Sequence, residues 1–271
     1  MVTRLQRKNH SKWYFTLARV LLFCLSSMLI LILCSSLTKD APDAIEDHLS
    51  ILASTLLTAS SILLFLRWEK LTPEDVGIVA KKHSVQRFLS GYAIGFSMAG
   101  AQALIVLMYG HFQLKPISDI SFIDILSPLL LYFFIACREE LAFRSYSLRS
   151  LNLSLGPIWA LSTMAVIFIF EHIAGGMTWG MAVLGSGTGA LLFGIAALKT
   201  KGLALSLGLH SAWNLGQWTF GFKNKPGIWE AVVEKGFEAE MEHVGLAAFL
   251  LVMALTIAGV LFHYRKSELA E

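Results

Sequence analysis

Four side chains that can activate water or stabilise negative charge lie in or beside apolar segments: Glu139, His172, His210 and Asn214. A carboxylate can take a proton from water, and an imidazole or amide N–H can stabilise the oxyanion that forms when water attacks a carbonyl. A glutamate and two histidines can also ligate zinc and leave a position open for water. The residue types therefore indicate hydrolysis, either with a metal held by Glu139, His172 and His210 or with Glu139 as a metal-free base. No HExxH motif favours the metal.

Glu139 is followed by a second glutamate, and the two have different helical neighbours. Glu140 and Arg144 are four residues apart with the acid first, the order that favours an ion pair on one helix face. Glu139 is rotated by about 100° from Glu140 and has no such partner. We therefore assign Glu139 as the candidate base, with Glu140 and Arg144 supporting it. The alternative is a cluster of interfacial charges that extend to the lipid headgroups.

Only two of the eight histidines, His172 and His210, lie on apolar segments, and the other six fall in loops or near segment ends. Asn214 follows His210 by four residues, so on a helix its amide can orient the imidazole or donate to an oxyanion. Phe168 lies one turn before His172, where it packs or shapes a substrate slot. Glu171 receives no role. A single membrane histidine is more often a packing residue, so the functional interpretation depends on the whole set.

The elements that carry these residues are predicted to be membrane helices. Of the 271 residues, 55% are hydrophobic and 15% charged, and the mean hydropathy is +0.63, which excludes an ordinary soluble domain. Apolar runs of roughly 17 to 25 residues are long enough to cross a hydrocarbon core as helices. We predict an all-α bundle of about eight transmembrane helices, forming a single membrane domain over residues 1–271. The spans are 13–37, 46–66, 88–109, 122–143, 157–173, 180–198, 202–220 and 243–263.

The charge distribution and the cysteines indicate how the chain is oriented in the membrane and which kinds of partner it binds. Most lysines and arginines fall in the segments on the side that carries the termini, which predicts that both termini are cytoplasmic. The net charge of +3 forms no basic stripe, so we expect membrane lipid and a peptide or protein substrate as partners, and no nucleic acid. The three cysteines lie in apolar segments and indicate neither disulfides nor a CxxC zinc site.

Three further expectations concern local structure. Gly185 and Gly189 form a face of small residues, which predicts the close approach of another helix. The segment 67–87 predicts a short interfacial helix. If the spans start at their interfaces, Glu139 lies about 5 Å, His210 about 12 Å and His172 about 22 Å from the inner face, at about 1.5 Å per residue. A shared site therefore requires tilt, a shifted span or a thinner membrane.

The ordered set Glu-Glu-x-x-x-Arg at 139–144, Phe-x-x-x-His at 168–172 and His-x-x-x-Asn at 210–214 resembles the signature of the CPBP family of intramembrane proteases. This family includes CAAX prenyl protease 2 enzymes and bacterial bacteriocin-processing and self-immunity proteins. The resemblance covers residues 118–220 and implies a catalytic core that hydrolyses peptide bonds in or beside the bilayer.

By the same resemblance, Glu139, His172, His210 and Asn214 are catalytic, and Glu140 and Arg144 are supporting. Both a metal mechanism and a glutamate mechanism are associated with the family, so zinc remains an open expectation. The compact chain is more similar to bacterial members, which implies a bacterial inner membrane and unprenylated peptide substrates. The alternative function is non-enzymatic, either an immunity or scaffold factor or a transporter. A transporter predicts repeated halves with broken helices, and the sequence shows no such symmetry.

Overall fold

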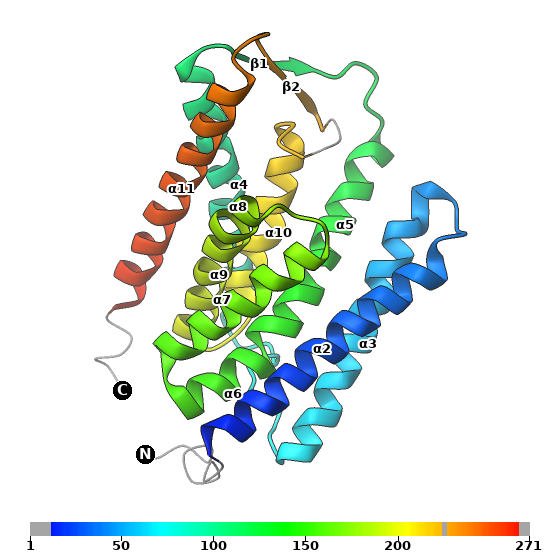
Figure 1. Cartoon of the computed structure of the whole chain (residues 1–271), viewed down its shortest axis with the longest axis vertical. Coiled ribbons are helices and arrows are strands. Elements are labelled where there is room, and N and C mark those ends of the chain that lie inside the picture. Colours follow the sequence, from blue (N-terminus) through cyan, green and yellow to red (C-terminus); the bar gives the residue numbers. More distant parts are fainter. Residues whose placement is uncertain (1–11, 224–226, 266–271) are drawn as a thin grey trace.

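The computed structural model describes residues 12–223 and 227–265, and it is a bundle of helices (Figure 1). The long helices are α2 (Trp13–Thr38), α3 (Asp43–Glu69), α4 (Ser84–Tyr109), α5 (Phe122–Glu139), α7 (Pro157–Ala174), α9 (Gly187–Thr200), α10 (Ala204–Thr219) and α11 (Glu238–His263). The shorter elements are the helices α6 (Tyr146–Leu155) and α8 (Trp179–Met181), the π-helices η1 (Glu140–Arg144) and η2 (Ala182–Ser186), and the strands β1 (Phe112–Pro116) and β2 (Trp229–Val233).

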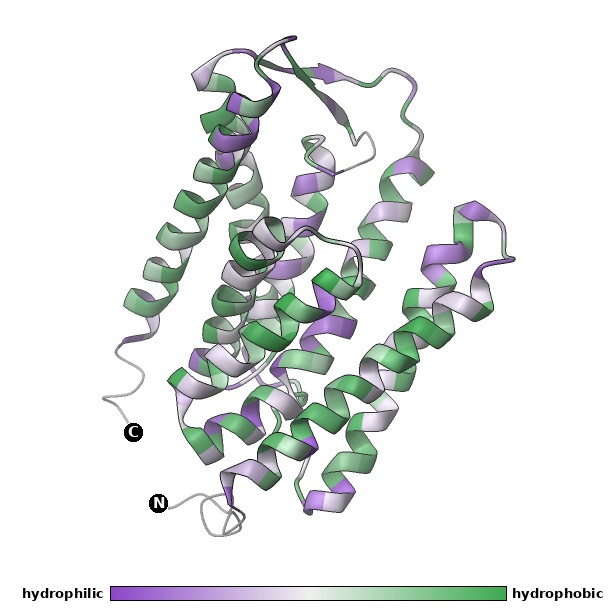
Figure 2. Ribbon diagram, in the orientation of Figure 1, coloured by the Kyte–Doolittle hydropathy of each residue, from purple (hydrophilic) through white to green (hydrophobic). Residues whose placement is uncertain are grey.

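The predicted fold class is confirmed, because the described part of the chain contains six helices that are long and apolar enough to cross a membrane. Each of the eight predicted spans falls on helical structure. In Figure 1 α2 begins at the lower end of the bundle and α11 runs downward from the upper end, so the start of α2 and the end of α11 face the same side. Figure 2 shows hydrophilic residues at the ends of the helices and also part of the way along α5 and α7. The chain is therefore an integral membrane protein with polar groups inside its helical bundle.

The two predicted spans outside that set of six, α5 and α10, carry Glu139, His210 and Asn214. The 18 residues of α5 include three charged side chains, those of Asp124, Arg138 and Glu139. Helix α10 has 16 residues, which corresponds to about 24 Å and is shorter than a hydrocarbon core of about 30 Å. Their polarity and length mark these helices as the interior, site-bearing elements of the bundle.

Glycines fix α10 against α4. A Cβ atom added at Gly208 would lie 2.2 Å from the backbone oxygen of Phe88, and one added at Gly95 would lie 2.4 Å from that of Leu209. Only glycine permits the two backbones to approach so closely, and this packing holds the segment that carries His210. The prediction that another helix approaches closely at Gly185 and Gly189 was wrong. A Cβ added at these positions would have its nearest neighbouring atom at 4.0 and 3.5 Å, respectively.

A second set of contacts fixes the end of α5. The hairpin of α2 and α3 packs on α6 through an aromatic cluster in which the ring centroid of Tyr146 lies 5.1 Å from that of Phe23 and 5.3 Å from that of Phe65. The Tyr146 hydroxyl donates to Glu69, which also accepts a hydrogen bond from Arg19 Nε at 2.7 Å. Because α6 follows η1 directly, these contacts also anchor the turn that contains Glu140 and Arg144.

Two features outside the long helices differ from the predictions. The predicted interfacial helix in 67–87 is wrong: α3 continues to Glu69, α4 begins at Ser84, and the residues between them form turns and irregular backbone. The sequence also did not predict the antiparallel pairing of β1 with β2, which runs from Phe112 opposite Val233 to Pro116 opposite Trp229. This small sheet covers the upper end of the bundle in Figure 1.

Candidate active site

The four predicted catalytic residues, Glu139, His172, His210 and Asn214, line a single cavity of about 760 Å³. The cavity is bordered at its upper end by residues of the sheet, including Phe112 and Ala231, and by the first turn of α11. The predicted conflict in depth is resolved partly by α7, which runs obliquely across the bundle in Figure 1 and so does not rise by 1.5 Å per residue along the membrane normal.

Glu139 and Glu140 both contact His210, but at different nitrogens. The Nδ1 atom of His210 lies 3.0 Å from Glu140 Oε1, a hydrogen bond in which the imidazole donates to the carboxylate. The Nε2 atom lies 3.6 Å from Glu139 Oε2, which is beyond ordinary hydrogen-bond distance. The Glu140 side chain is only 1% exposed, whereas that of Glu139 is 14% exposed and faces the large cavity. Glu140 therefore orients the histidine, and Glu139 is open to a water or a substrate.

Arg144 is the cation that supports Glu140. Its Nε lies 3.7 Å from Glu140 Oε1, the predicted i,i+4 pair, and both side chains are almost fully buried. The guanidinium lies against three aromatic rings, at 4.4 Å from the centroid of Phe168, 5.6 Å from Phe143 and 5.7 Å from Phe193. Neither terminal nitrogen has a hydrogen-bond partner among the described residues. The ring faces and the Glu140 carboxylate together stabilise this buried charge.

The histidine of α7 is oriented by its own helix. His172 Nδ1 lies 2.9 Å from the carbonyl oxygen of Phe168, and because a carbonyl only accepts, the proton of that hydrogen bond belongs to the imidazole. A neutral His172 therefore presents an unprotonated Nε2. The Phe168 ring packs against the imidazole at a centroid distance of 4.3 Å, and Phe168 also lines the cavity. Both sequence interpretations of Phe168, packing and shaping of the cavity, agree with this position.

Asn214 has a partner that the sequence analysis missed. Lys223, in the loop after α10, donates from Nζ to Asn214 Oδ1 at 3.3 Å, and its ammonium lies 5.4 Å from the centroid of the Tyr132 ring. Burial lowers the pKa of the Lys223 ammonium, and the negative charge of Glu139 opposes this shift. Lys223 lies beyond the predicted span 202–220, and no local pattern relates it to Asn214.

A second missed contact accounts for Glu171. Its carboxylate pairs with the buried guanidinium of Arg138, which also donates at 3.4 Å to the backbone and hydroxyl oxygens of Ser27. This network joins α7, α5 and α2 on either side of the site. Glu171 therefore neutralises Arg138, a residue to which the sequence analysis assigned no role.

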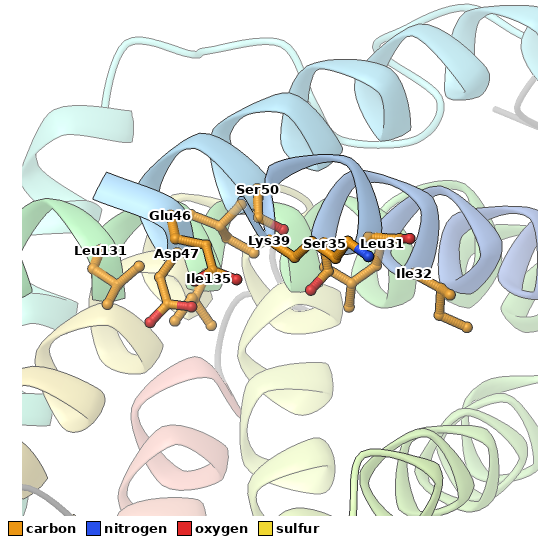
Figure 3. A pocket seen from close by; sticks show the side chains of 11 residues that line it. Leu31, Ile32, Ser35, Lys39, Glu46, Asp47, Ser50, Leu131 and Ile135 are labelled. Carbon is orange, nitrogen blue, oxygen red and sulfur yellow. The ribbon is translucent and has the colours of Figure 1, made fainter. Parts of the chain in front are cut away.

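Two other cavities border the helices of the site. One of about 260 Å³ is lined by Glu140 and Cys137 together with loop residues such as Gly77 and Gly202, so the two neighbouring glutamates face different cavities. The other, of about 680 Å³, lies between α2, α3 and α5 (Figure 3). It combines apolar side chains with Lys39, Glu46 and Asp47 and contains none of the predicted catalytic residues.

The spacing of the donor side chains bears on whether they surround a common point. Within residues 12–223 and 227–265, no group of three or more histidine, cysteine, aspartate or glutamate side chains is placed so that it could hold one. His210 directs Nδ1 to Glu140, and His172 directs Nδ1 to the carbonyl of Phe168, so protein groups orient both imidazoles and leave their Nε2 atoms free for either chemistry. The arrangement can instead place a water between Glu139 and an imidazole nitrogen.

Comparison with known families gives one match. Residues 121–216 match the model of the Rce1-like family, described as type II CAAX prenyl endopeptidase Rce1-like. The matched segment lies inside the predicted core of 118–220 and contains the four predicted catalytic residues together with Glu140, Arg144 and Phe168. No curated protein and no solved structure matches the chain. The predicted resemblance to CPBP intramembrane proteases is confirmed by this family match.

Proposed function

We propose that the protein cleaves unprenylated, membrane-associated peptides with Glu139 as a metal-free general base, and the match of residues 121–216 to the Rce1-like family supports a protease of this kind. The observation that carries this proposal is the separation of the two glutamates. Glu140 is bound to His210 and Arg144, whereas Glu139 lies in the large cavity beside His210 Nε2 without an arginine partner within salt-bridge distance in the described residues.

In the proposed reaction, a water held by Glu139 attacks the carbonyl carbon of the scissile peptide bond. Glu139 takes one proton from that water, and the free Nε2 of His172 accepts a hydrogen bond from the other. The new C–O bond moves the carbonyl electron pair onto oxygen. The cavity is large enough for several peptide residues, because volumes of about 300 to 1,000 Å³ are typical of ligand sites.

The tetrahedral intermediate is stabilised by α10. The Asn214 amide donates to the oxyanion, and Glu140 holds the neighbouring His210 in place through Nδ1. Glu139 then delivers its proton to the leaving nitrogen as the C–N bond breaks, which restores the carboxylate. Every proton transfer in this scheme uses a group that lines one cavity.

We also propose an orientation. The lower end of the bundle, with the first turn of α2 and the last turn of α11, faces the cytoplasm of a bacterial cell, and the sheet faces the opposite side of its inner membrane. Three lysines of the loop between α3 and α4, Lys70, Lys81 and Lys82, and Arg87 in the first turn of α4 support this orientation.

The test is cleavage of a peptide library by the purified protein in detergent, with products identified by mass spectrometry. We expect wild type to cleave and Glu139→Gln to lose activity by about 10³-fold or more, because the base is removed. Glu242→Gln is the matched control, since Glu242 also lines the cavity but lies on α11, and it should retain activity. Cleavage that survives unchanged in Glu139→Gln would refute the assignment.

A chelator separates the two chemistries. Activity should persist after prolonged dialysis against a chelator, and added zinc should not increase it. Loss of activity that zinc restores would instead require a metal. Peptide binding without cleavage by wild type, under conditions in which the protein is folded, would favour the non-enzymatic alternative.

A further inference from the structure

The chain turns sharply after α10 and returns a lysine to the cavity. The turn uses Gly221, whose φ of +72° favours glycine, and a Cβ at this position would lie 2.7 Å from both the nitrogen of Ala231 and the oxygen of Trp229. The nitrogen of Phe222 donates to the oxygen of Gln217 at 2.8 Å and closes the turn. This packing against β2 places Lys223 beside Asn214, nine residues earlier in the chain.

The hydrogen bond between these residues has one possible direction. A lysine ammonium has donors only, so the Asn214 atom at 3.3 Å from Nζ must be the amide oxygen. The amide NH₂ group then points away from Lys223. We propose that Lys223 is a positioning residue, which fixes the Asn214 amide so that its NH₂ group donates to the oxyanion of the reacting peptide; this inference rests on the proposed function.

The surroundings of Lys223 support this role over that of a structural ion pair. No carboxylate in the described part of the chain lies within salt-bridge distance of Nζ, and the other close group is the face of the Tyr132 ring. Glu139 lines the same cavity and balances the charge at longer range. A cation at this point also polarises the Asn214 amide, which strengthens the hydrogen bond that its NH₂ group donates.

The test compares steady-state kinetics of Lys223→Met, Lys223→Arg and Asn214→Ala with wild type on one peptide substrate. We expect Lys223→Met to lower kcat by about 10- to 100-fold with KM changed less than about threefold, because the oxyanion donor acts in the transition state. Lys223→Arg should recover most of kcat, since a guanidinium also donates. Lys115→Met, at an exposed lysine of β1, is the control and should not change kcat.

A double variant tests whether Lys223 acts through Asn214. In the Asn214→Ala background, adding Lys223→Met should reduce kcat no further, whereas independent roles would multiply the two losses. Multiplied losses would overturn the inference, as would an unchanged kcat in Lys223→Met when Asn214→Ala is impaired, and both results would leave the proposed function intact. An unchanged kcat in Asn214→Ala would overturn both. The folding of each variant is checked by thermal unfolding in detergent, and recovery by Lys223→Arg excludes a general loss of structure.

Discussion

The two neighbouring glutamates should respond differently to the same substitution. Glu139→Gln and Glu140→Gln both remove one carboxylate and preserve its shape. We expect both variants to lose activity, the first because the base is gone and the second because His210 loses the anion that orients it. Only Glu140→Gln should also lose much of its stability, because only Glu140 is the partner of the buried Arg144.

The contacts of Glu140 determine how much stability Glu140→Gln should lose. Arg144 Nε lies 3.7 Å from Glu140 Oε1, with side-chain exposures of 2% and 1%, and at an effective dielectric constant of about 20 this attraction is about 4 kcal/mol. Removal of one partner from a buried pair costs about 3 to 5 kcal/mol, because the remaining charge is uncompensated. For a chain of this size, a loss of about 3 kcal/mol lowers Tm by about 6 to 12 °C.

Glu139→Gln should not lose a comparable amount of stability. Its nearest polar contact is His210 Nε2 at 3.6 Å, and its side chain is 14% exposed to the cavity. We therefore expect the Tm of Glu139→Gln to stay within about 2 °C of wild type, because substitutions away from strong contacts change stability by about 0.5 kcal/mol or less.

The assay is thermal unfolding in one detergent, followed by tryptophan fluorescence, together with peptide cleavage at a temperature at which all three proteins are folded. Activity should fall by about 10³-fold or more for Glu139→Gln and by about 10²- to 10⁴-fold for Glu140→Gln, the range for loss of the anion behind a catalytic histidine. Equal Tm values for the two variants, or a larger decrease for Glu139→Gln, would refute this division of roles.

Two further predictions concern the helix packing around the site. Gly208→Ala should lower Tm and impair cleavage, because its Cβ would lie 2.2 Å from the oxygen of Phe88 and would separate α10 from α4. Gly245→Ala is the control, because a Cβ at Gly245 would meet nothing within 4 Å, and equal Tm values for the two variants would contradict the packing argument. Arg138→Met should destabilise the protein by about 3 to 5 kcal/mol, measured by unfolding in detergent, because Glu171 is left buried and unpaired. Adding Glu171→Leu should restore most of that loss, and a double variant no more stable than Arg138→Met would count against the pair.

The parts of the fold that depend on local signals could be predicted from the sequence. An apolar run long enough to cross lipid has few alternatives to a helix, so the positions of the eight spans followed from composition alone. The pair of Glu140 and Arg144 was also predictable, because residues four apart on a helix are neighbours. The prediction of an interfacial helix in 67–87 was wrong because a polar stretch with a proline is compatible both with a helix start and with turns.

The contacts that complete the site join residues far apart in the chain. His210 meets Glu140 across 70 positions, and Arg138 meets Glu171 across 33. No period or spacing encodes such contacts, and the contact of His210 with Glu140 depends on the glycine packing of α10 against α4. Lys223 was missed for a related reason, since only the turn at Gly221 against β2 returns it to the cavity. The match of three ordered motifs indicated the core, but not these partners.

The distribution of arginines explains why one of three nearby carboxylates is suited to act as the base. Arg144 pairs with Glu140, and Arg138 pairs with Glu171, so each of these two carboxylates has a guanidinium partner. A carboxylate that is already engaged by a guanidinium is less available to hold a reacting water. Glu139 has a histidine nitrogen at 3.6 Å instead, and it begins the turn at which α5 becomes the π-helix η1. Such π segments occur often at functional sites, and here the change of helix type lies between the two glutamates that face different cavities. The chemical difference between two identical side chains therefore arises from which cations the fold assigns to each.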